Sequence, residues 1–322
     1  MFTWITALEN LGQALSYSVG GSLDDIHKRP MDEWDRFNGI CETGVSTTWS
    51  LNYYVAGVAG LVAGLSFLAI VSNTPDEMEG SYISAEELRY CRRYCKVDAN
   101  TFTEKVTVTK SAEAPILAML TNKAAWATGT LHFCFAWGVN VLLFYLPTYL
   151  EEYYQEGTEL AGQLVAVSQL VAMAIGLATG LVADWLISTR LTVRQTRISV
   201  MAVCVCLFSA GMLVPFYVED RMVGTGFALL ALAVVPMAQA GYGANYADIC
   251  PHYTLVLLSI FNSFANLSSP LSIFVEGNIL GAHSFSVDQN WERAACLSVG
   301  IFFLGFLVYA GFMEGHPIQD NN

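Results

Sequence analysis

The chain has 322 residues, of which 54% are hydrophobic and only 13% are charged, and its formal net charge is −13. A soluble domain carries about a quarter charged residues, so the composition excludes an ordinary cytosolic enzyme and a disordered chain. The acidic balance also excludes a nucleic-acid-binding protein, which would need a basic surface.

Eight apolar segments of 20 to 26 residues carry almost none of this charge. In chain order they are Thr3–Leu23, Leu51–Val71, Ala125–Tyr149, Leu160–Ala183, Ile198–Val218, Met222–Ala247, Tyr253–Val275 and Ala294–Met313. Of the 15 basic and 28 acidic residues, these segments contain one, Glu9. A helix needs about 20 apolar residues to cross a bilayer, because each backbone polar group must be satisfied inside the segment. The sequence therefore predicts an all-α, multi-pass membrane protein with eight transmembrane helices.

The loops between these segments differ in charge. Residues 72–123 contain seven of the fifteen Lys and Arg residues, and residues 184–197 contain three more. A loop expected on the opposite side is acidic, with Glu151, Glu152 and Glu156. Because basic loops stay in the cytosol, we expect both termini and the 72–123 connector to be cytosolic.

The spacing of the segments divides the chain into four expected regions. Two helices come first, then a polar connector, then six helices and a short tail. The regions are 1–71 (part of an N-terminal bundle), 72–124 (cytosolic connector), 125–315 (C-terminal six-helix bundle) and 316–322 (cytosolic tail). In the connector, Ser84 and Glu87 have the spacing of a capping box, which predicts the start of an amphipathic helix along the membrane surface.

Four stretches, in matching order, carry a family resemblance. They are Tyr82–Glu87, Trp137 with Leu146–Tyr149, Gly180–Leu186, and Asn245–Tyr253 followed by Asn262. With them the chain resembles the major facilitator superfamily, and within it solute carrier family 17: sialin, the vesicular glutamate transporters and the type I sodium/phosphate cotransporters. The resemblance covers the family's helices five to twelve and implies a major facilitator-like bundle of twelve. We therefore expect this chain to be partial and to lack half of the substrate pocket.

Asp184 lies at the predicted cytosolic end of a span, four residues after Gly180. The helix dipole opposes a carboxylate at a helix C-terminus, so Asp184 needs a positive partner. Arg190, Arg194 and Arg197 follow it. In the superfamily such an arrangement resembles a cytosolic latch that holds two helix bundles in one of two states. The alternative is that the basic residues only set the topology and that Asp184 is solvated.

Asn245 and Asp248 are three residues apart, so they share a helix face. Pro251 then ends the helix. We expect Asp248 to act as a gate at the cytosolic mouth, with a simple role at the helix end as the alternative. Asn245 lies one turn deeper and is a candidate for the substrate pathway.

Asn262 and Asn266 share one face of the next span, which also contains Pro270. An unpaired amide is costly in a membrane. These residues therefore either line the substrate pathway or join helices by hydrogen bonds. Pro270 should bend the span.

Trp137 and Asn140 share a face of the span Ala125–Tyr149 and are further pathway candidates. His132, on the same helix, is a candidate for proton coupling because imidazole titrates near neutral pH, and a simple hydrogen-bonded role is the alternative. By resemblance, the glutamate-carrying branch has Arg where Phe135 stands, and its absence weakens glutamate as the substrate. The remaining pathway candidates are Gln169, Gln239 and Tyr242.

These observations predict a secondary active transporter of a small organic or inorganic anion, coupled to H⁺ or Na⁺, that works by alternating access in a lipid bilayer. The alternative is a truncated membrane protein that does not transport and that associates with or regulates an intact transporter. An enzyme is not expected, since hydrolase and metalloprotease motifs are absent. The eight cysteines lack zinc spacing, so we expect neither a metal nor a cofactor. A vesicular or lysosomal membrane and the plasma membrane remain alternative locations.

Overall fold

The computed structural model describes residues 9–19, 49–70, 84–94, 116–154, 158–251, 253–281 and 286–317. The chain divides into two compact units. Met1–Ser46 and Pro115–Asn322 form the larger unit, and Thr47–Ala114 form the smaller one. All regular elements in the described ranges are helical, which confirms the predicted all-α class.

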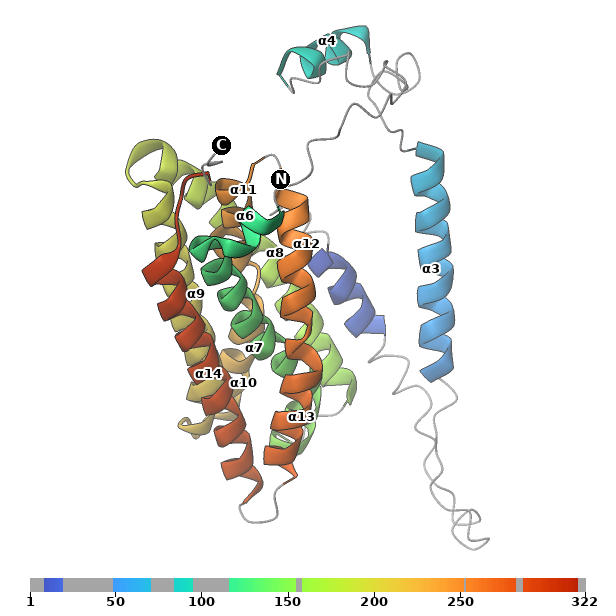
Figure 1. The fold of residues 1–322 in the computed structure, drawn as a ribbon. Coiled ribbons are helices and arrows are strands. Elements are labelled where there is room, and N and C mark those ends of the chain that lie inside the picture. Colours follow the sequence, from blue (N-terminus) through green and yellow to red (C-terminus); the bar gives the residue numbers. More distant parts are fainter. Residues whose placement is uncertain are drawn as a thin grey trace, which may run out of the picture. The chain divides into compact units, whose positions relative to one another are not determined.

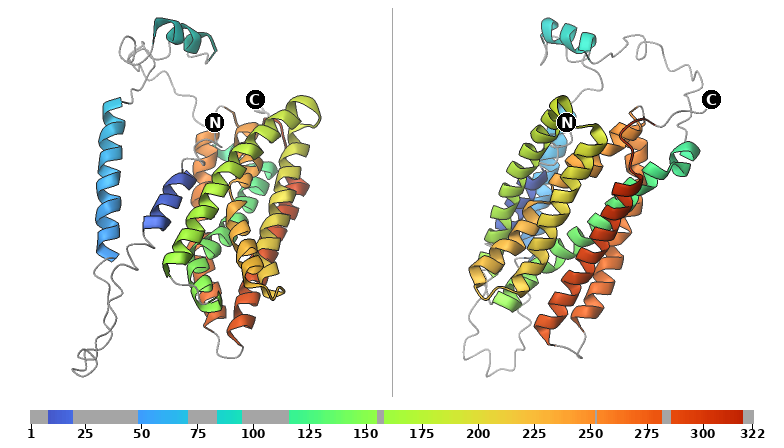
Figure 2. Two further views of the ribbon diagram at one scale, coloured as in Figure 1. Left: turned by 180° about the vertical axis from the view of Figure 1, so that it is seen from behind. Right: turned by 90° about the vertical axis from the view of Figure 1, so that its left-hand side faces the viewer.

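Five membrane-length helices of the larger unit match five of the predicted spans. They are α7 (Lys123–Tyr154), α8 (Thr158–Thr189), α9 (Val193–Leu213) with the short helix η2 (Val214–Phe216), the pair α12 (Thr254–Asn266) and α13 (Ser268–Leu280), and α14 (Val287–Phe312). Figures 1 and 2 show these helices side by side in one bundle. Large apolar side chains such as Leu181, Phe274 and Leu304 are exposed on them, as expected for a surface solvated by lipid.

The other three predicted spans are not matched by a membrane-length apolar helix among the described residues. Residues 9–19 are helical, and the rest of the span Thr3–Leu23 lies outside the described residues. α3 (Trp49–Ile70) of the smaller unit covers the second span, with Tyr53–Ala69 as its described apolar part. α10 (Arg221–Ala233) covers only the first half of Met222–Ala247. The predicted count of eight membrane helices is therefore not confirmed.

The predicted span Met222–Ala247 consists of two helical segments. After α10 the chain turns at residues 234–236, forms the π-helix η3 (Gln239–Gly243) and continues as α11 (Ala244–Ile249). Pro236 in the turn has no N–H to offer to a helical carbonyl. Arg197 Nη1 donates to the Ala240 carbonyl oxygen at 2.8 Å. The Arg197 side chain of α9 thus stabilises η3, whose π-helical turn is wider than an α-helical turn.

α12 and α13 meet at a break at Leu267, three residues before Pro270. Pro270 cannot donate a backbone hydrogen bond, so the Asn266 carbonyl loses its helical partner. The Leu267 backbone keeps helical torsion angles, φ −64° and ψ −21°, and the bend expected at this proline stays a prediction. The break separates two helices, α12 and α13, within one apolar segment, Thr254–Leu280.

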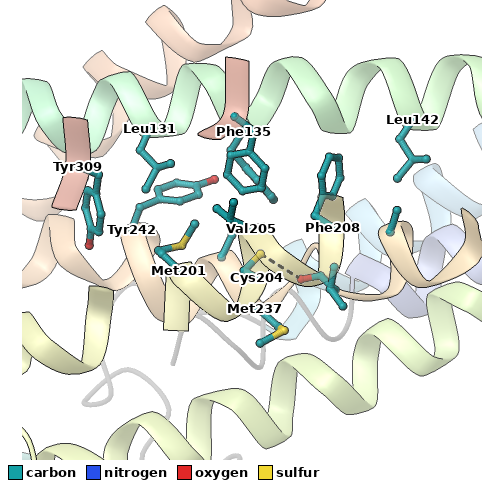
Figure 3. Packing of buried hydrophobic residues seen from close by; sticks show 14 of the residues in the cluster. Leu131, Phe135, Leu142, Met201, Cys204, Val205, Phe208, Met237, Tyr242 and Tyr309 are labelled. Carbon is teal, nitrogen blue, oxygen red and sulfur yellow. Dashed lines mark hydrogen bonds between the residues drawn. The ribbon is translucent and has the colours of Figure 1, made fainter. Parts of the chain in front are cut away.

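α7 lies at the centre of the bundle and contacts α8, α10, α12, α13 and α14. Its Leu131 and Phe135 pack with Phe208 of α9 and Tyr242 of η3 in one buried apolar cluster (Figure 3). The contact between α7 and α14 is close. A Cβ at Gly305 of α14 would lie 2.6 Å from the Cβ of Cys134, so only glycine fits this crossing.

The smaller unit contains α4 (Ala85–Tyr94), which begins with the predicted capping box. The Glu87 N–H donates to Ser84 Oγ at 3.2 Å, and the Ser84 N–H donates to Glu87 Oε2 at 2.9 Å. The hydrogen bonds from Ser84 hold the pKa of the Glu87 carboxyl below its usual value. The helix start is confirmed, and its place on a membrane surface stays a prediction.

Candidate functional site

A buried carboxyl group, Glu276, lies in α13 between α7 and α14. Trp137 Nε1 of α7 donates to Glu276 Oε1 at 3.1 Å, and Ser298 Oγ of α14 donates to the same oxygen at 2.8 Å. Glu276 and Ser298 are completely buried. An acidic side chain is rare in an apolar helix and usually marks a functional position.

Polar side chains continue along the same face of α13. Ser268, Ser272 and Glu276 follow at four-residue spacing, which puts them on one side of the helix, and all three are fully buried. Asn140 Nδ2 donates to Ser268 Oγ at 3.3 Å. Trp137 and Asn140 therefore both face α13, as their spacing predicted. We name Trp137, Asn140, Ser268, Glu276 and Ser298 the α13 polar seam.

Sequence reasoning missed Glu276 because it ended this span at Val275. The structure continues the helix to Leu280, so the carboxyl is inside the apolar segment Thr254–Leu280 rather than in a loop. The sequence signal that could have found it is the four-residue spacing of Ser268, Ser272 and Glu276. This helical spacing indicates that the helix continues beyond Val275.

A second polar group joins α7 to η3 and α11. His132 Nδ1 lies 3.2 Å from Tyr246 Oη, and the His132 ring lies against Tyr242, with ring centroids 4.6 Å apart. Asn245 Nδ2 donates to Thr128 Oγ1 at 2.8 Å. All five side chains are buried. His132 thus has the surroundings expected if it only forms hydrogen bonds, which was the alternative to proton coupling. Its part in proton coupling stays a prediction.

The predicted latch residues separate into different contacts. Arg197 Nε donates to Asp248 Oδ2 at 2.8 Å, and Arg197 Nη2 donates to Asp248 Oδ1 at 3.3 Å. Arg194 instead donates to the carbonyl oxygens of Ala310 and Met313 at the end of α14. Asp184 and Arg190 are exposed, and in the described ranges no ion pair reaches either. The structure therefore joins Arg197 to Asp248 and leaves Asp184 available to another partner.

The remaining predicted pathway residues do not form one site. Gln169 is buried in α8, and its Nε2 donates to Gln13 Oε1 at 2.7 Å. Gln239 is half-buried in η3, where its side chain covers Gly243. Asn262 and Asn266 are both exposed on α12. These two amides face outward from the helices of this chain.

Two other kinds of ligand site can form in a helix bundle: a cluster of metal ligands and a pocket between the helices. In the part of the chain that the structure describes, no three His, Cys, Asp or Glu side chains gather as metal ligands. A pocket of about 50 Å³ lies between α7, α9, α10 and α14, and its lining is almost entirely apolar, with Leu142, Met212 and Trp291 among its residues. An anion would lose its hydration there without new hydrogen bonds, so the α13 polar seam and the polar group around His132 are better candidates.

A comparison with protein families decides which kind of bundle this is. The sequence model of the Major Facilitator Superfamily matches residues 1–273 of the chain. The chain belongs to the Major Facilitator Superfamily. The match confirms the resemblance seen in the four sequence stretches, and it identifies the bundle as that of an integral membrane transporter family.

Curated relatives of this Major Facilitator Superfamily chain are members of solute carrier family 17. It is 24% identical to sialin of Ovis aries, over 97% of the chain and 63% of sialin. It is 24% identical to sodium-dependent phosphate transport protein 4 of Homo sapiens, over 83% of the chain and 60% of that protein. It is 26% identical to vesicular glutamate transporter 3 of Danio rerio, over 83% of the chain and 44% of that protein. The chain thus spans less than two thirds of these relatives.

Proposed function

We propose that the protein carries a small organic or inorganic anion across a membrane, coupled to an H⁺ or Na⁺ gradient, by alternating access. The observation that carries the proposal is membership of the Major Facilitator Superfamily together with relatives named for anion transport. Those names include sialin, a sodium-dependent phosphate transport protein, a vesicular glutamate transporter and a probable small intestine urate exporter.

The exposed face of α12 supports a polar pathway on that side of the bundle. Asn262 and Asn266 are exposed amides in a helix whose other polar residues are one threonine and two serines. An amide facing lipid would lose its hydrogen bonds, so this face is suited to water, to a solute or to another helix bundle. Ser259 on the same helix differs, because its Oγ donates to the Leu255 carbonyl oxygen at 2.7 Å.

The charged residues near the ends of α8, α9 and α11 support a gate. Arg197 and Asp248 are paired across two helices, whereas Asp184 and Arg190 are exposed. A gate needs groups that can exchange partners between two arrangements. Asp184 and Arg190 fit that role, and the Arg197–Asp248 pair holds α9 to α11 while they exchange.

Uptake by the purified chain in liposomes tests the transport proposal. We expect accumulation of at least one of sialic acid, phosphate, urate or glutamate under an imposed H⁺ or Na⁺ gradient. Asn262→Ala should lower the initial rate about tenfold, which corresponds to about 1.4 kcal/mol for one lost hydrogen bond to the solute. The matched control Ser259→Ala should leave the rate unchanged. Absence of accumulation for all four solutes would contradict the proposal.

A second candidate function is association with an intact transporter, or its regulation. The observation that favours it is the exposed amide face of α12, Asn262 and Asn266, which also suits contact with another helix bundle. Co-expression with sialin followed by affinity purification tests it, and recovery of both proteins in one complex is the expected result. Robust uptake by this chain alone, with no recovered complex, would rule this function out.

A further inference from the structure

The two oxygens of the Glu276 carboxyl group have different surroundings. Oε1 accepts hydrogen bonds from Trp137 and Ser298, whereas Oε2 is buried without a hydrogen-bond partner among the described residues. In the same ranges no Lys, Arg or His forms an ion pair with Glu276. An ionised carboxylate shares its charge between both oxygens and needs donors or a cation on each. This arrangement instead suits a neutral acid, with Oε1 as the carbonyl oxygen and the proton on Oε2.

Few other ionisable groups face Glu276. From α7 the nearest is Tyr145, whose Oη donates to the Ile273 carbonyl oxygen at 3.1 Å. α12 contains no ionisable residue. From α14 the contact is Ser298, and the acidic Glu292 of that helix instead accepts a hydrogen bond from Tyr217 at 2.7 Å. Glu276 is therefore the one acidic group of the α13 polar seam.

A tilt of α13 at the break at Leu267 would let Glu276 reach water. α13 is a separate helix of 13 residues after the break, and its contacts with α7 and α14 include the two hydrogen bonds to Oε1. If α13 tilts about the break, Trp137 and Ser298 separate from the carboxyl. Water that enters the gap can then accept the proton and solvate the carboxylate.

We propose that Glu276 is a proton-binding site of the helix bundle, neutral when α13 packs on α7 and α14 and ionised when α13 tilts away. The ligand is a proton, which leaves Oε2 for water and returns from water. In transport, Glu276 would couple proton movement to the rearrangement of the bundle. This coupling role rests on the transport function proposed above. Proton binding itself does not depend on that function.

Infrared spectroscopy of the full chain in liposomes tests proton binding directly. At neutral pH the wild-type spectrum should contain a protonated-carboxyl band that Glu276→Gln removes. Glutamine preserves the shape and an acceptor for both donors, but it cannot titrate. The matched control Glu292→Gln should keep the band. A band that is unchanged in Glu276→Gln, or that is absent from the wild type, would overturn the proposal.

A second variant covers the case in which Glu276→Gln does not fold. Ser298→Ala keeps the carboxyl and removes one donor from Oε1, so the carbonyl stretch should move to higher frequency. A band at an unchanged frequency would show that the protonated group is elsewhere and would overturn the assignment.

Transport measurements separate the coupling role from the transport function. Glu276→Gln should lose accumulation driven by a proton gradient, while solute exchange at equal pH on both sides keeps at least half of the wild-type rate. Wild-type accumulation in this variant would overturn the coupling role. If the wild-type chain takes up no solute, the transport function fails, and the infrared result still decides whether Glu276 binds a proton.

Discussion

Arg197 and Asp248 show how a single side-chain pair can hold three parts of the bundle. Arg197 binds the Asp248 carboxylate with two nitrogens and the Ala240 carbonyl with the third. The Arg197 side chain is only 9% exposed, so water could not replace the hydrogen bonds that Arg197 would lose with a partner. Arginine suits this position because two nitrogens of its planar guanidinium group can bind a carboxylate while the third donates elsewhere.

Removing either partner of this pair should destabilise the protein. Arg197→Met and Asp248→Asn should each lower the free energy of unfolding by about 1–3 kcal/mol, because each leaves a partly buried charge unpaired. The double variant should lose less than the sum of the single losses. Unfolding of the purified protein in detergent measures this. The exposed Arg190 provides the control, since Arg190→Met should change stability by less than about 0.5 kcal/mol.

At this scale the sequence predicted contacts that depend on local spacing and missed those that depend on folding. The capping box and the common face of Trp137 and Asn140 follow from intervals of three residues. Glu276 was missed because the span boundary was set at Val275, five residues before the helix ends at Leu280. The partner of Arg197 could not be read from the sequence, because 51 residues separate it from Asp248.

Close helix crossings depend on the size of single residues in α7 and α14. A Cβ at Gly305 would lie 2.6 Å from the Cβ and 2.9 Å from the Sγ of Cys134, whereas a Cβ at Gly300 of the same helix would meet nothing within 4 Å. The Cβ of Cys134 is fixed to the backbone, so the two helices would have to separate. Overpacking of this kind is destabilising.

Two matched substitutions test this crossing. Gly305→Ala should lower the free energy of unfolding by about 1–3 kcal/mol, and Gly300→Ala should be neutral or slightly stabilising, because alanine favours a helix. Denaturant titration of both variants in one detergent makes the comparison. Equal stabilities would show that α14 does not pack on α7 as described.

The elements were predicted best where apolar length alone decides the helix. α7, α8, α9 and α14 overlap the predicted spans because a run of apolar residues without charge has few other structures in lipid. The span Met222–Ala247 was wrongly expected to be continuous. The interruption depends on Pro236 and on the hydrogen bond from Arg197 to the Ala240 carbonyl oxygen. The hydropathy of the segment cannot predict a bond from another helix.

The whole molecule presents its loops at opposite ends of antiparallel helices. Ser188 and Glu219 are both exposed, one near the end of α8 and the other between α9 and α10. Since α9 crosses the bundle between them, they lie on opposite sides of the membrane if α9 spans it. The basic residues near Ser188 favour the cytosol for that side.

Thiol labelling tests this orientation. In a background with the eight native cysteines replaced, Glu219→Cys should react with an impermeant maleimide added outside sealed right-side-out vesicles. Ser188→Cys should react only after the membrane is permeabilised. Labelling of Ser188→Cys in sealed vesicles would reverse the predicted orientation.

At the scale of the molecule, the sequence predicted the membrane class and the family, since both rest on features repeated over the whole chain. The number of membrane helices was not confirmed, because Met222–Ala247 is broken and because parts of the first two predicted spans lie outside the described residues. The same difference applies to the candidate site. Its polar residue types were visible in the sequence, but the seam that brings Glu276 to Trp137 and Ser298 depends on how α13 packs.

The wide turn η3 has a consequence for how the chain tolerates changes in length. A π-helix holds one residue more than the α-helical turn it replaces, and each residue of an α-helix adds about 100° of rotation. Deleting one residue from Gln239–Gly243 would let the segment close into an ordinary α-helix. Because the π turn and the shorter α turn cover nearly the same rotation, α11 would keep its angular position, and Asn245 and Asp248 would still face Thr128 and Arg197. This short stretch therefore absorbs one extra residue without changing the direction in which the α11 side chains point.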